Sequence, residues 1–387
     1  MLYRKFGKTE EMVSILGFGC MRLPLMPGGD PSKINEELAS ELIRHAIDEG
    51  VNYIDAAYPY HGKGISSAGR SEPVVGKILG DGYREKVKLA TKLPSWLINS
   101  RGDMDKILNE QLERLETDHI DFYLVHALNK SSWKDVRDAG IADFLEQAIR
   151  DGRIRYAGFS YHDQQENFNG IVDAFDWSFC QIQYNYMDEE FQAGRKGLEY
   201  AAKKGLGITI MEPLRGGKLA QNLPDSVRTA FHRSGKIRKP AEWALGWIWN
   251  HPEVSLLISG MNSMEQVTEN IKSGGNATEG SFSDSDKDVI EKVKNIYRQR
   301  IKVDCTACGY CMPCPSGVDI PGCFDYFNNF HMFGKENNYR FLKAGQRASD
   351  CTECGSCEVH CPQSLPIPEL LKDVREVFEP TWKMVTD

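Results

Sequence analysis

The stretch VNYIDAAYPY (residues 51–60) joins a short apolar run to a polar end. Its first half has the length and the β-branched and aromatic content of a buried strand. Seven more runs of this kind occur, separated by amphipathic stretches with helical periodicity, such as Asn35–Gly50 and Met104–Asp118. The eight runs span residues 14–20, 51–57, 86–92, 121–127, 155–160, 179–185, 206–212 and 254–260. Eight strands alternating with helices over about 260 residues predict an α/β fold, a (β/α)8 or TIM barrel.

A doubly wound open sheet is the alternative fold for such an alternating pattern. The first run is not followed by a GxGxxG segment, which weakens a dinucleotide-binding sheet of that type. The opening segment, residues 1–14, is interpreted as a hairpin that closes the bottom of the barrel.

Three successive runs end in ionisable side chains, namely Asp55, Lys92 and His126, and Tyr60 follows Asp55 by five residues. In a TIM barrel the carboxyl ends of all strands meet at one rim, where such enzymes keep their chemistry. We therefore expect the four side chains to converge, and convergence favours a catalytic role over four unrelated structural roles.

These four groups suit the reduction of a carbonyl compound. A tyrosine has an ordinary pKa near 10, and the ammonium of Lys92 is expected to lower the pKa of Tyr60 by favouring the phenolate. Asp55 would pair with Lys92, and His126 would donate a hydrogen bond to the carbonyl oxygen. Together they would polarise a carbonyl group and deliver a proton while a hydride reaches the carbon.

Residues 1–295 resemble the aldo-keto reductase family. The Asp, Tyr, Lys and His tetrad of that family matches Asp55, Tyr60, Lys92 and His126. The resemblance implies a barrel domain over 1–295 that binds NADPH in an extended form and reduces aldehydes or ketones by hydride transfer.

The resemblance also implies cofactor-binding positions. Ser160 and Gln181 match residues that hold the nicotinamide carboxamide, and Met211 stands where many members have an aromatic residue that stacks on nicotinamide. MEPLRGGKL (211–219) resembles the pyrophosphate loop, and ISGMNSMEQVTEN (258–270) resembles the adenosine segment. The matched residues in these two segments are Pro213, Leu214, Gly216, Gly217, Lys218, Gly260, Met261, Ser263, Gln266 and Asn270.

One departure from the family concerns the 2′-phosphate of NADPH, which many members bind with a lysine and an arginine. The matching residues here are Gly260 and Gln266. Neither supplies charge-assisted hydrogen bonds to a dianion, so NADH stays open as the cofactor beside NADPH.

The last part of the chain is rich in cysteine. Of 11 cysteines, nine lie between Cys305 and Cys361, which predicts a separate C-terminal domain over 296–387. CTACGYCMPCP (305–315) and CTECGSCEVHCP (351–362) each carry four closely spaced cysteines with a proline after the last. This pattern favours metal clusters over disulfides, and residues of about 300–370 resemble a bacterial two-cluster ferredoxin module.

In such modules the fourth cysteine of each run binds the other cluster. We therefore expect one 4Fe–4S cluster on Cys305, Cys308, Cys311 and Cys361, and a second on Cys351, Cys354, Cys357 and Cys314. Cys323 is a reserve ligand for Cys314 because the last spacing of the first run is one residue shorter than usual, although a buried thiol is the preferred interpretation. Zinc is the competing metal, but the two Cys-Pro endings favour iron–sulfur.

The net charge of −8 gives no reason to expect a nucleic-acid partner. Neither an N-terminal apolar signal segment nor a membrane-length apolar run is recognisable, so a cytoplasmic location is expected. The preferred function is an NAD(P)H-dependent reductase of a small carbonyl substrate, with Tyr60 as general acid. Its clusters would couple to or regulate the reaction, with a ferredoxin or another electron carrier as a partner. The alternatives are an iron–sulfur electron-transfer enzyme or a redox-sensing subunit, in which nicotinamide is not the main electron donor.

Overall fold

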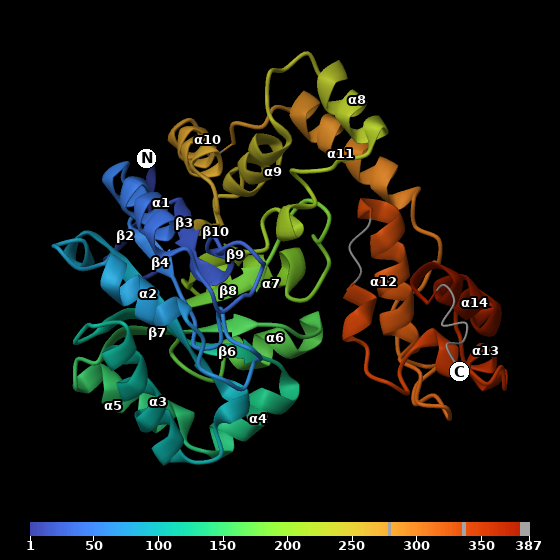
Figure 1. The fold of residues 1–387 in the computed structure, drawn as a ribbon, viewed down its shortest axis with the longest axis horizontal. Helices are drawn as coiled ribbons and strands as arrows, with labels where there is room; N and C mark the ends of the chain where they lie inside the picture. Colours follow the sequence, from blue (N-terminus) through green and yellow to red (C-terminus); the bar gives the residue numbers. More distant parts are fainter. Residues whose placement is uncertain (278–279, 335–337, 380–387) are drawn as a thin grey trace. The chain divides into compact units, whose positions relative to one another are not determined.

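A computed structural model describes residues 1–277, 280–334 and 338–379. Within them eight parallel strands close into a barrel in the order β10-β3-β4-β5-β6-β7-β8-β9, which confirms the predicted fold (Figure 1). The strands are β3 (Leu16–Gly19), β4 (Tyr53–Asp55), β5 (Lys88–Pro94), β6 (Ile120–Leu128), β7 (Ile154–Tyr161), β8 (Phe179–Gln183), β9 (Gly207–Met211) and β10 (Leu256–Ser259). All eight overlap the runs predicted from the sequence.

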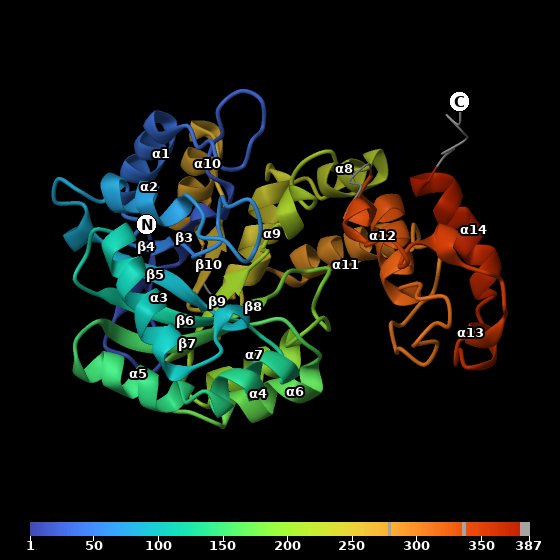
Figure 2. The same ribbon diagram turned by 60° about the horizontal axis from the view of Figure 1, so that its bottom comes forward.

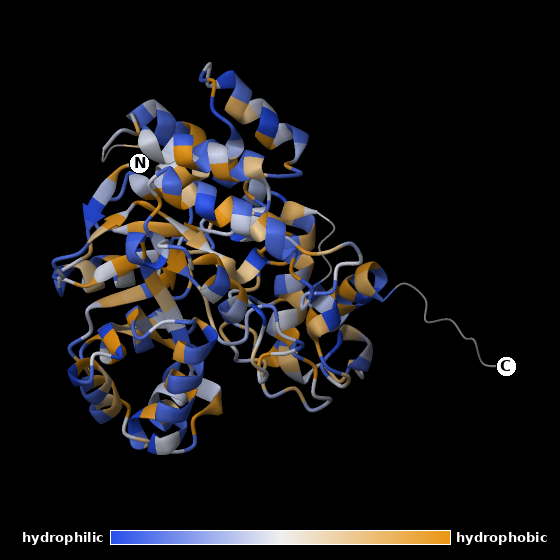
Figure 3. Ribbon diagram, turned by 60° about the vertical axis from the view of Figure 1, so that its left-hand side comes forward, coloured by the Kyte–Doolittle hydropathy of each residue, from blue (hydrophilic) through white to orange (hydrophobic). Residues whose placement is uncertain are grey.

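Helices surround the barrel (Figures 1 and 2). Figure 3 shows both hydrophobic and hydrophilic segments along these helices, as expected for amphipathic helices on a buried sheet. They are α1 (Glu36–Asp48), α2 (Ser71–Ile78), α3 (Arg101–Arg114), α4 (Lys130–Asp138), α5 (Ile141–Arg150), α6 (Gln165–Val172), α7 (Gly194–Lys203), α9 (Pro240–Trp249) and α10 (Met264–Gly275). Short 3₁₀ turns are η1 (Cys20–Arg22), η2 (Arg84–Lys86), η3 (Ser95–Leu97), η4 (Arg215–Gly217), η5 (Asn338–Phe341) and η6 (Ala348–Asp350).

The predicted N-terminal hairpin is present. Strands β1 (Tyr3–Lys5) and β2 (Met12–Ser14) pair antiparallel. Phe6 follows β1 and is fully buried among core aromatic rings, with ring centroids 4.6 Å from Phe122 and 5.3 Å from Phe179. The backbone of Gly7 approaches the start of β9 so closely that a side chain at Gly7 would overlap Gly207. The hairpin therefore closes the amino-terminal end of the barrel.

The chain divides into two compact units. The first is Met1–Ala220 with Arg238–Asp284, and the second is Gln221–Ile237 with Ser285–Asp387. Helices of the second unit are α8 (Asp225–Arg233), α11 (Asp284–Arg298), α12 (Ile320–Phe333), α13 (Ser356–Val359) and α14 (Ile367–Phe378). Lys236 binds both carboxylate oxygens of the buried Asp286, at 2.6 and 2.7 Å, which ties the segment after α8 to α11. A boundary between domains at residue 295 stays a prediction.

The second unit has its own apolar core. Phe324, Phe327 and Val374 bring α12 and α14 together, and the rings of Tyr339 and Phe378 stack with centroids 4.6 Å apart. Cys323 is fully buried in this core, as expected for a structural thiol.

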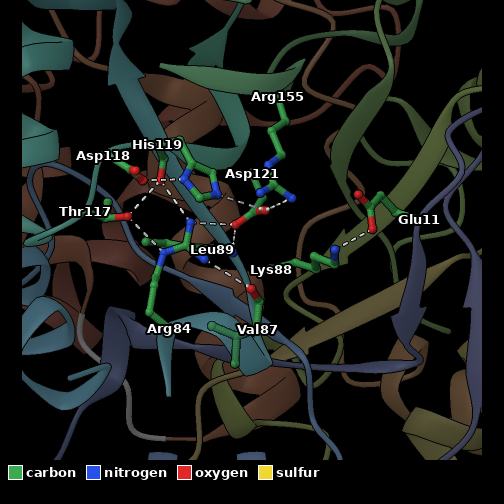
Figure 4. Close-up of polar contacts among 10 residues, drawn as sticks. All are labelled: Glu11, Arg84, Val87, Lys88, Leu89, Thr117, Asp118, His119, Asp121 and Arg155. Carbon is green, nitrogen blue, oxygen red and sulfur yellow. Dashed lines mark hydrogen bonds and ion pairs between the residues drawn. The ribbon is translucent and has the colours of Figure 1, made fainter. Parts of the chain in front are cut away.

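A charged network holds the amino-terminal ends of β5 and β6 together (Figure 4). The buried Asp121 carboxylate accepts hydrogen bonds from Arg84 at 2.8 Å and from the backbone N–H of Leu89 at 2.9 Å. Arg155 lies 3.2 Å from its other oxygen. Because this carboxylate is only 3% exposed, these partners replace the water that it loses on burial.

Replacing Asp121 with alanine should therefore destabilise the barrel. Asp121→Ala leaves Arg84 partly buried without its counter-ion, and we expect the free energy of unfolding to fall by about 3 kcal/mol. Asp118→Ala is the control, because Asp118 is 94% exposed and contacts His119, which also lies 3.7 Å from Asp121. It should change stability by less than about 0.5 kcal/mol. Urea unfolding followed by tryptophan fluorescence measures both, and equal losses would contradict the role given to Asp121.

Candidate functional site

The four residues of the expected tetrad lie on three neighbouring strands. Asp55 is the last residue of β4, Lys92 lies in β5, and His126 lies in β6. In the barrel register Asp55 is level with Ala90 and His126 with Pro94, so all three lie towards the carboxyl ends of their strands. Tyr60 is in the loop after β4.

A buried ion pair joins two of them. The Lys92 ammonium donates to Asp55 Oδ1 at 2.6 Å and to the carbonyl oxygen of Ala56 at 2.8 Å. Lys92 is 0% and Asp55 is 3% exposed. The ammonium also lies 4.8 Å from the centre of the Tyr60 ring. The barrel thus holds a positive charge beside the tyrosine, and Asp55 compensates for its burial.

The Lys92 ammonium stays charged in this setting. Burial lowers the pKa of Lys92, but Asp55 and then Tyr60 outweigh burial, so the pKa is raised above its ordinary value. Burial raises the pKa of Asp55, which Lys92 opposes.

The pKa of Tyr60 departs from the expectation. Burial raises the pKa of Tyr60 above its ordinary value, and the lowering effect of Lys92 only partly offsets this. Lys92 lowers the pKa of Tyr60, as predicted. The predicted net lowering of this pKa is nevertheless wrong for the protein alone. Burial destabilises the phenolate by more than the ammonium of Lys92 stabilises it. Tyr60 is therefore a protonated phenol at neutral pH, as a proton donor must be.

His126 completes the tetrad as a neutral imidazole. Burial, and then the charge of Lys92, hold the pKa of His126 well below its ordinary value. Its ring centre lies 6.1 Å from that of Tyr60, in an edge-on arrangement. Its Nδ1 atom is buried and has no hydrogen-bond partner among the described residues. Such an atom costs stability unless a ligand satisfies it.

Trp96 also belongs to this site, and sequence reasoning missed it. Its ring centre lies 5.1 Å from that of His126, and its indole N–H donates to the Ile65 carbonyl oxygen at 3.0 Å. It therefore connects the loop after Tyr60 to His126. Its place two residues after the end of β5 was the available signal, since that position lies at the reactive rim.

The residues expected to hold nicotinamide lie on adjacent strands. Ser160 in β7 is level with Gln181 in β8, and Met211 ends the neighbouring β9. The Gln181 amide N–H group contacts the Met211 sulfur at 3.6 Å, whereas the Gln181 amide oxygen is buried without a partner. The Ser160 hydroxyl oxygen accepts a hydrogen bond from the Ala127 N–H at 2.7 Å. This buried amide oxygen could accept a hydrogen bond from the N–H group of a ligand, such as a carboxamide.

The expected diphosphate segment forms a tight turn after β9. Pro213 and Leu214 lead into η4, where Gly216 and Gly217 have φ angles of 66° and 94°. These left-handed conformations favour glycine, and Lys218 follows directly, its N–H bonded to the Arg215 carbonyl oxygen at 3.2 Å.

The expected adenosine segment follows β10 and begins α10. Gly260 directly follows the strand, Met261 is buried, and the Ser263 hydroxyl caps the helix by accepting from the Gln266 N–H at 3.3 Å. The side-chain oxygen of Gln266 accepts from the Asn262 N–H at 2.9 Å, and Asn270 donates to Ser259 at 3.1 Å. The side chains of Gln266 and Asn270 thus already form hydrogen bonds with nearby residues of the protein.

In the second unit the two cysteine runs share one backbone geometry. Ala307 and Glu353, each two residues after the first cysteine of its run, have φ angles of 54° and 55°. Each donates its N–H to the sulfur of that cysteine, Cys305 or Cys351, at 3.4 Å. Glycines at 309 and 355 again have positive φ. Repetition of this turn, with N–H groups aimed at sulfur, is suited to thiolates bound to a cluster.

The cysteines line two separate cavities. One, of about 330 Å³ including its open mouth, is lined by Cys305, Cys308, Cys311 and Cys361. The other, of about 300 Å³, is lined by Cys314, Cys351, Cys354 and Cys357. Each cavity therefore takes three cysteines from one run and the fourth from the other. Ile320 lines both cavities, so one side chain stands between them.

The cysteine side chains do not converge on a single ion. Among the described residues no group of three or more His, Cys, Asp or Glu side chains is placed to hold one metal ion. A structural zinc needs four ligands around one ion, whereas a cubane presents a different iron to each thiolate. The spread of the four sulfurs around each cavity therefore suits a 4Fe–4S cluster better. Separately, none of the described helices has the length and apolar character that a bilayer crossing requires.

Comparisons with known proteins match two successive parts of the chain. The profile of the aldo/keto reductase family matches residues 15–295. The chain belongs to the aldo/keto reductase family. A 4Fe-4S dicluster domain profile matches residues 304–365, so an iron–sulfur domain of this type follows the reductase barrel.

Individual relatives cover the barrel. The uncharacterized oxidoreductase YrpG of Bacillus subtilis (strain 168) is 28% identical over 77% of this chain and 96% of its own length. The 6-dehydroglucose reductase of Novosphingobium aromaticivorans is 26% identical over 69% of this chain and 88% of its own length. The solved structure of aldo-keto reductase AKR11C1 from Bacillus halodurans in its holo form is similar with a TM-score of 0.62, at 24% identity, over 76% of this chain and 96% of that one. At that identity the structural likeness supports the fold.

The pairing of cysteines can be tested by iron content. Cys314→Ala removes a ligand from the cavity that also holds Cys351, Cys354 and Cys357, so we expect loss of about half of the iron and acid-labile sulfide. Cys323→Ala is the matched control, because its thiol is fully buried in the apolar core, and it should retain all iron. Anaerobic purification and iron and sulfide assays measure both variants. If Cys314→Ala keeps all its iron and Cys323→Ala loses iron, Cys323 is the cluster ligand and Cys314 is not.

Proposed function

We propose that this aldo/keto reductase reduces an aldehyde or a ketone to an alcohol by hydride transfer from NAD(P)H, with Tyr60 as the general acid. The observation that supports this most is the buried ammonium of Lys92, held 2.6 Å from Asp55 and directly beside the Tyr60 ring. A fixed positive charge next to a protonated phenol is the arrangement that proton donation to a developing alkoxide requires.

When bound, NAD(P)H would supply a hydride, one proton with two electrons, to the carbonyl carbon. Tyr60 gives its proton to the carbonyl oxygen, so the C=O double bond becomes a C–OH single bond and Tyr60 becomes a phenolate. Lys92 stabilises that phenolate, and Asp55 keeps Lys92 charged and oriented. Tyr60 is half-buried, and it regains a proton from solvent after the product leaves.

His126 would position the substrate. Its imidazole is neutral, and the unpartnered Nδ1 shows that this side chain has unused hydrogen-bonding capacity. A neutral imidazole can donate one hydrogen bond to a carbonyl oxygen while adding no charge that competes with Lys92. Trp96 packs against it, and we propose that the indole forms an apolar wall of the substrate pocket.

Residues Ser160, Gln181 and Met211 would hold the nicotinamide ring beside the tetrad. Pro213, Leu214, Gly216, Gly217 and Lys218 would accommodate the diphosphate, and Gly260, Gln266 and Asn270 the adenosine. Because Gly260 and Gln266 carry no charge, we propose that NADH is accepted beside NADPH. The relatives named as reductases support the reaction class, but the substrate of this chain does not follow from their names.

The cysteine-rich domain, placed at 296–387, would carry two 4Fe–4S clusters that exchange single electrons with a ferredoxin or a similar carrier, or that regulate the barrel. Hydride transfer needs no metal, and nicotinamide does not readily release single electrons. We therefore propose that carbonyl reduction is completed within the barrel, 1–295. A cytoplasmic location stays a prediction.

Loss of the Tyr60 hydroxyl should abolish most activity. In Tyr60→Phe no phenol remains to protonate the oxygen, so kcat should fall by about 10²- to 10⁴-fold. Tyr58→Phe is the matched control, because the Tyr58 hydroxyl lies 3.4 Å from Glu110; its kcat should change less than threefold. Steady-state oxidation of NADH or NADPH with a panel of aldehydes measures both. Unchanged turnover in Tyr60→Phe would refute Tyr60 as the acid.

The rate of reduction should be independent of pH between about 6 and 8. The pKa of His126 lies well below its ordinary 6.5, so the imidazole takes up no proton as the pH falls through this range. The pKa of Tyr60 lies above its ordinary 10.0, so the phenol loses no proton as the pH rises to 8. A profile of kcat/KM against pH tests both statements. An inflection near pH 6.5 that disappears in His126→Gln would contradict the neutral imidazole.

A further inference from the structure

Glu72 carries a buried carboxylate that takes no part in the proposed proton transfer. It is the second residue of α2, the helix that follows the loop of Tyr60, and its side chain is fully buried. A carboxylate withdrawn from water costs stability unless donors surround it. The residues that bind this carboxylate therefore decide what its charge contributes to the fold.

Three donors from two neighbouring elements bind the Glu72 carboxylate. The Thr91 hydroxyl and the Gln111 amide N–H both donate to Oε1 at 2.6 Å, and Arg114 Nε donates to Oε2 at 2.9 Å. Thr91 lies in β5, whereas Gln111 and Arg114 lie in α3. Burial raises the pKa of Glu72, and the hydrogen bond from Thr91 and the charge of Arg114 oppose this rise. Because every partner is a donor, the site is suited to an ionised carboxylate.

Two of these donors belong to the surroundings of Lys92. Thr91 directly precedes Lys92 in β5. The Gln111 amide N–H group also donates to the Lys92 carbonyl oxygen at 3.0 Å, and the Gln111 amide oxygen accepts from the Tyr123 hydroxyl at 2.7 Å. Both ends of this buried amide are thus satisfied, which fixes its orientation. The Glu72 carboxylate therefore holds the part of β5 that carries the ammonium of Lys92.

The backbone next to Glu72 holds the loop of Tyr60. The N–H of Ser71, the residue directly before Glu72, donates to the Tyr60 carbonyl oxygen at 3.1 Å. Arg114, which binds the Glu72 carboxylate, also donates through Nη2 to the Gly69 carbonyl oxygen. Gly69 is so close to Tyr60 that an added Cβ would lie 1.9 Å from the Tyr60 carbonyl oxygen. The end of this loop is therefore bound to the start of α2.

We infer that Glu72 is a positioning residue that fixes the distance between the Lys92 ammonium and the Tyr60 phenol. Its backbone neighbour Ser71 binds Tyr60, and its carboxylate binds Thr91, the neighbour of Lys92. The inference rests on the proposed proton donation by Tyr60. Lys92 stabilises the phenolate only while the two stay close, because the attraction between charges falls with distance.

A positioning role differs from a purely structural one in what it does to the reaction. A purely structural carboxylate would stabilise the barrel and leave the rate of the chemical step unchanged. Loss of positioning would slow proton donation while the protein stays folded. The residues proposed to hold nicotinamide lie on β7, β8 and β9, whereas Glu72 joins α2 to β5 and α3. Cofactor binding should therefore be unaffected.

Glu72→Gln tests this directly, because it keeps the size of the side chain but removes its charge and turns one acceptor into a donor. We expect kcat for aldehyde reduction to fall by about tenfold to a hundredfold, since small displacements of reacting groups have effects of this size. The dissociation constants of NADH and NADPH should not change. Steady-state kinetics and calorimetry on the cluster-containing full chain measure these quantities.

A second pair of variants tests the contact with β5. Thr91→Val removes the hydroxyl that donates to Glu72 and should also lower kcat without weakening cofactor binding. Thr91→Ser keeps a hydroxyl at this position and should retain most of the turnover. This pair decides the inference alone if Glu72→Gln does not fold, which circular dichroism and iron content verify.

Asp121→Asn is the matched control for Glu72→Gln. Asp121 is also a buried carboxylate bound by an arginine, but it lies at the amino-terminal ends of β5 and β6 (Figure 4). Both variants should unfold at a lower urea concentration than the unaltered protein, because each leaves a buried arginine contact without its charge. Only Glu72→Gln should slow turnover.

Full turnover in both Glu72→Gln and Thr91→Val would overturn the inference. An equal loss of kcat in Asp121→Asn, or equal losses in Thr91→Val and Thr91→Ser, would show that stability rather than positioning is responsible, and would overturn it too. The proposed function fails separately if Tyr60→Phe keeps full turnover. An inactive Tyr60→Phe beside a fully active Glu72→Gln refutes only the positioning role.

Discussion

The ion pair between Lys92 and Asp55 is the interaction on which the proposed chemistry depends. An ammonium inside a barrel is stable only when a carboxylate and further acceptors surround it. Adjacent parallel strands supply this, since Asp55 ends β4 and Lys92 lies next to it in β5. The pair leaves a positive charge beside Tyr60 and lowers the proton affinity of His126. Burial is the main reason why the pKa of Tyr60 is raised and that of His126 lowered, while the Lys92 charge opposes the first shift and adds to the second.

The barrel and the convergence of the three strand ends could be predicted from the sequence, because the periodicity and the ends of strands depend on local residues. The eight apolar runs predicted the barrel, and the strand ends brought Asp55, Lys92 and His126 together as expected. What escaped prediction depends on contacts distant in sequence. Burial reverses the expected net shift of the Tyr60 pKa, and Trp96 meets His126 only in the fold. Lys236 and Asp286 also escaped prediction. The sequence assigns both residues to the barrel domain, 1–295, but their ion pair lies within the second unit of the structure.

The cysteine-rich domain uses a different principle, in which short turns are repeated. Two runs with the same left-handed positions direct N–H groups to Cys305 and Cys351, and each cavity takes its fourth cysteine from the other run. Ile320 lies between the cavities, so two clusters there would be close neighbours able to hold one electron each. The barrel, in contrast, is suited to moving two electrons together as a hydride.

Isotope tracing tests most directly whether the carbonyl carbon receives a hydride from the nicotinamide ring. NADH or NADPH carrying deuterium at both C4 positions would be supplied with an aldehyde, and the alcohol analysed by mass spectrometry and NMR. Hydride transfer beside Tyr60 predicts one deuterium on the carbinol carbon of every product molecule. Product that carries only solvent hydrogen at that carbon would contradict hydride transfer, and would indicate that single electrons from the clusters, followed by protonation, carry out the reduction.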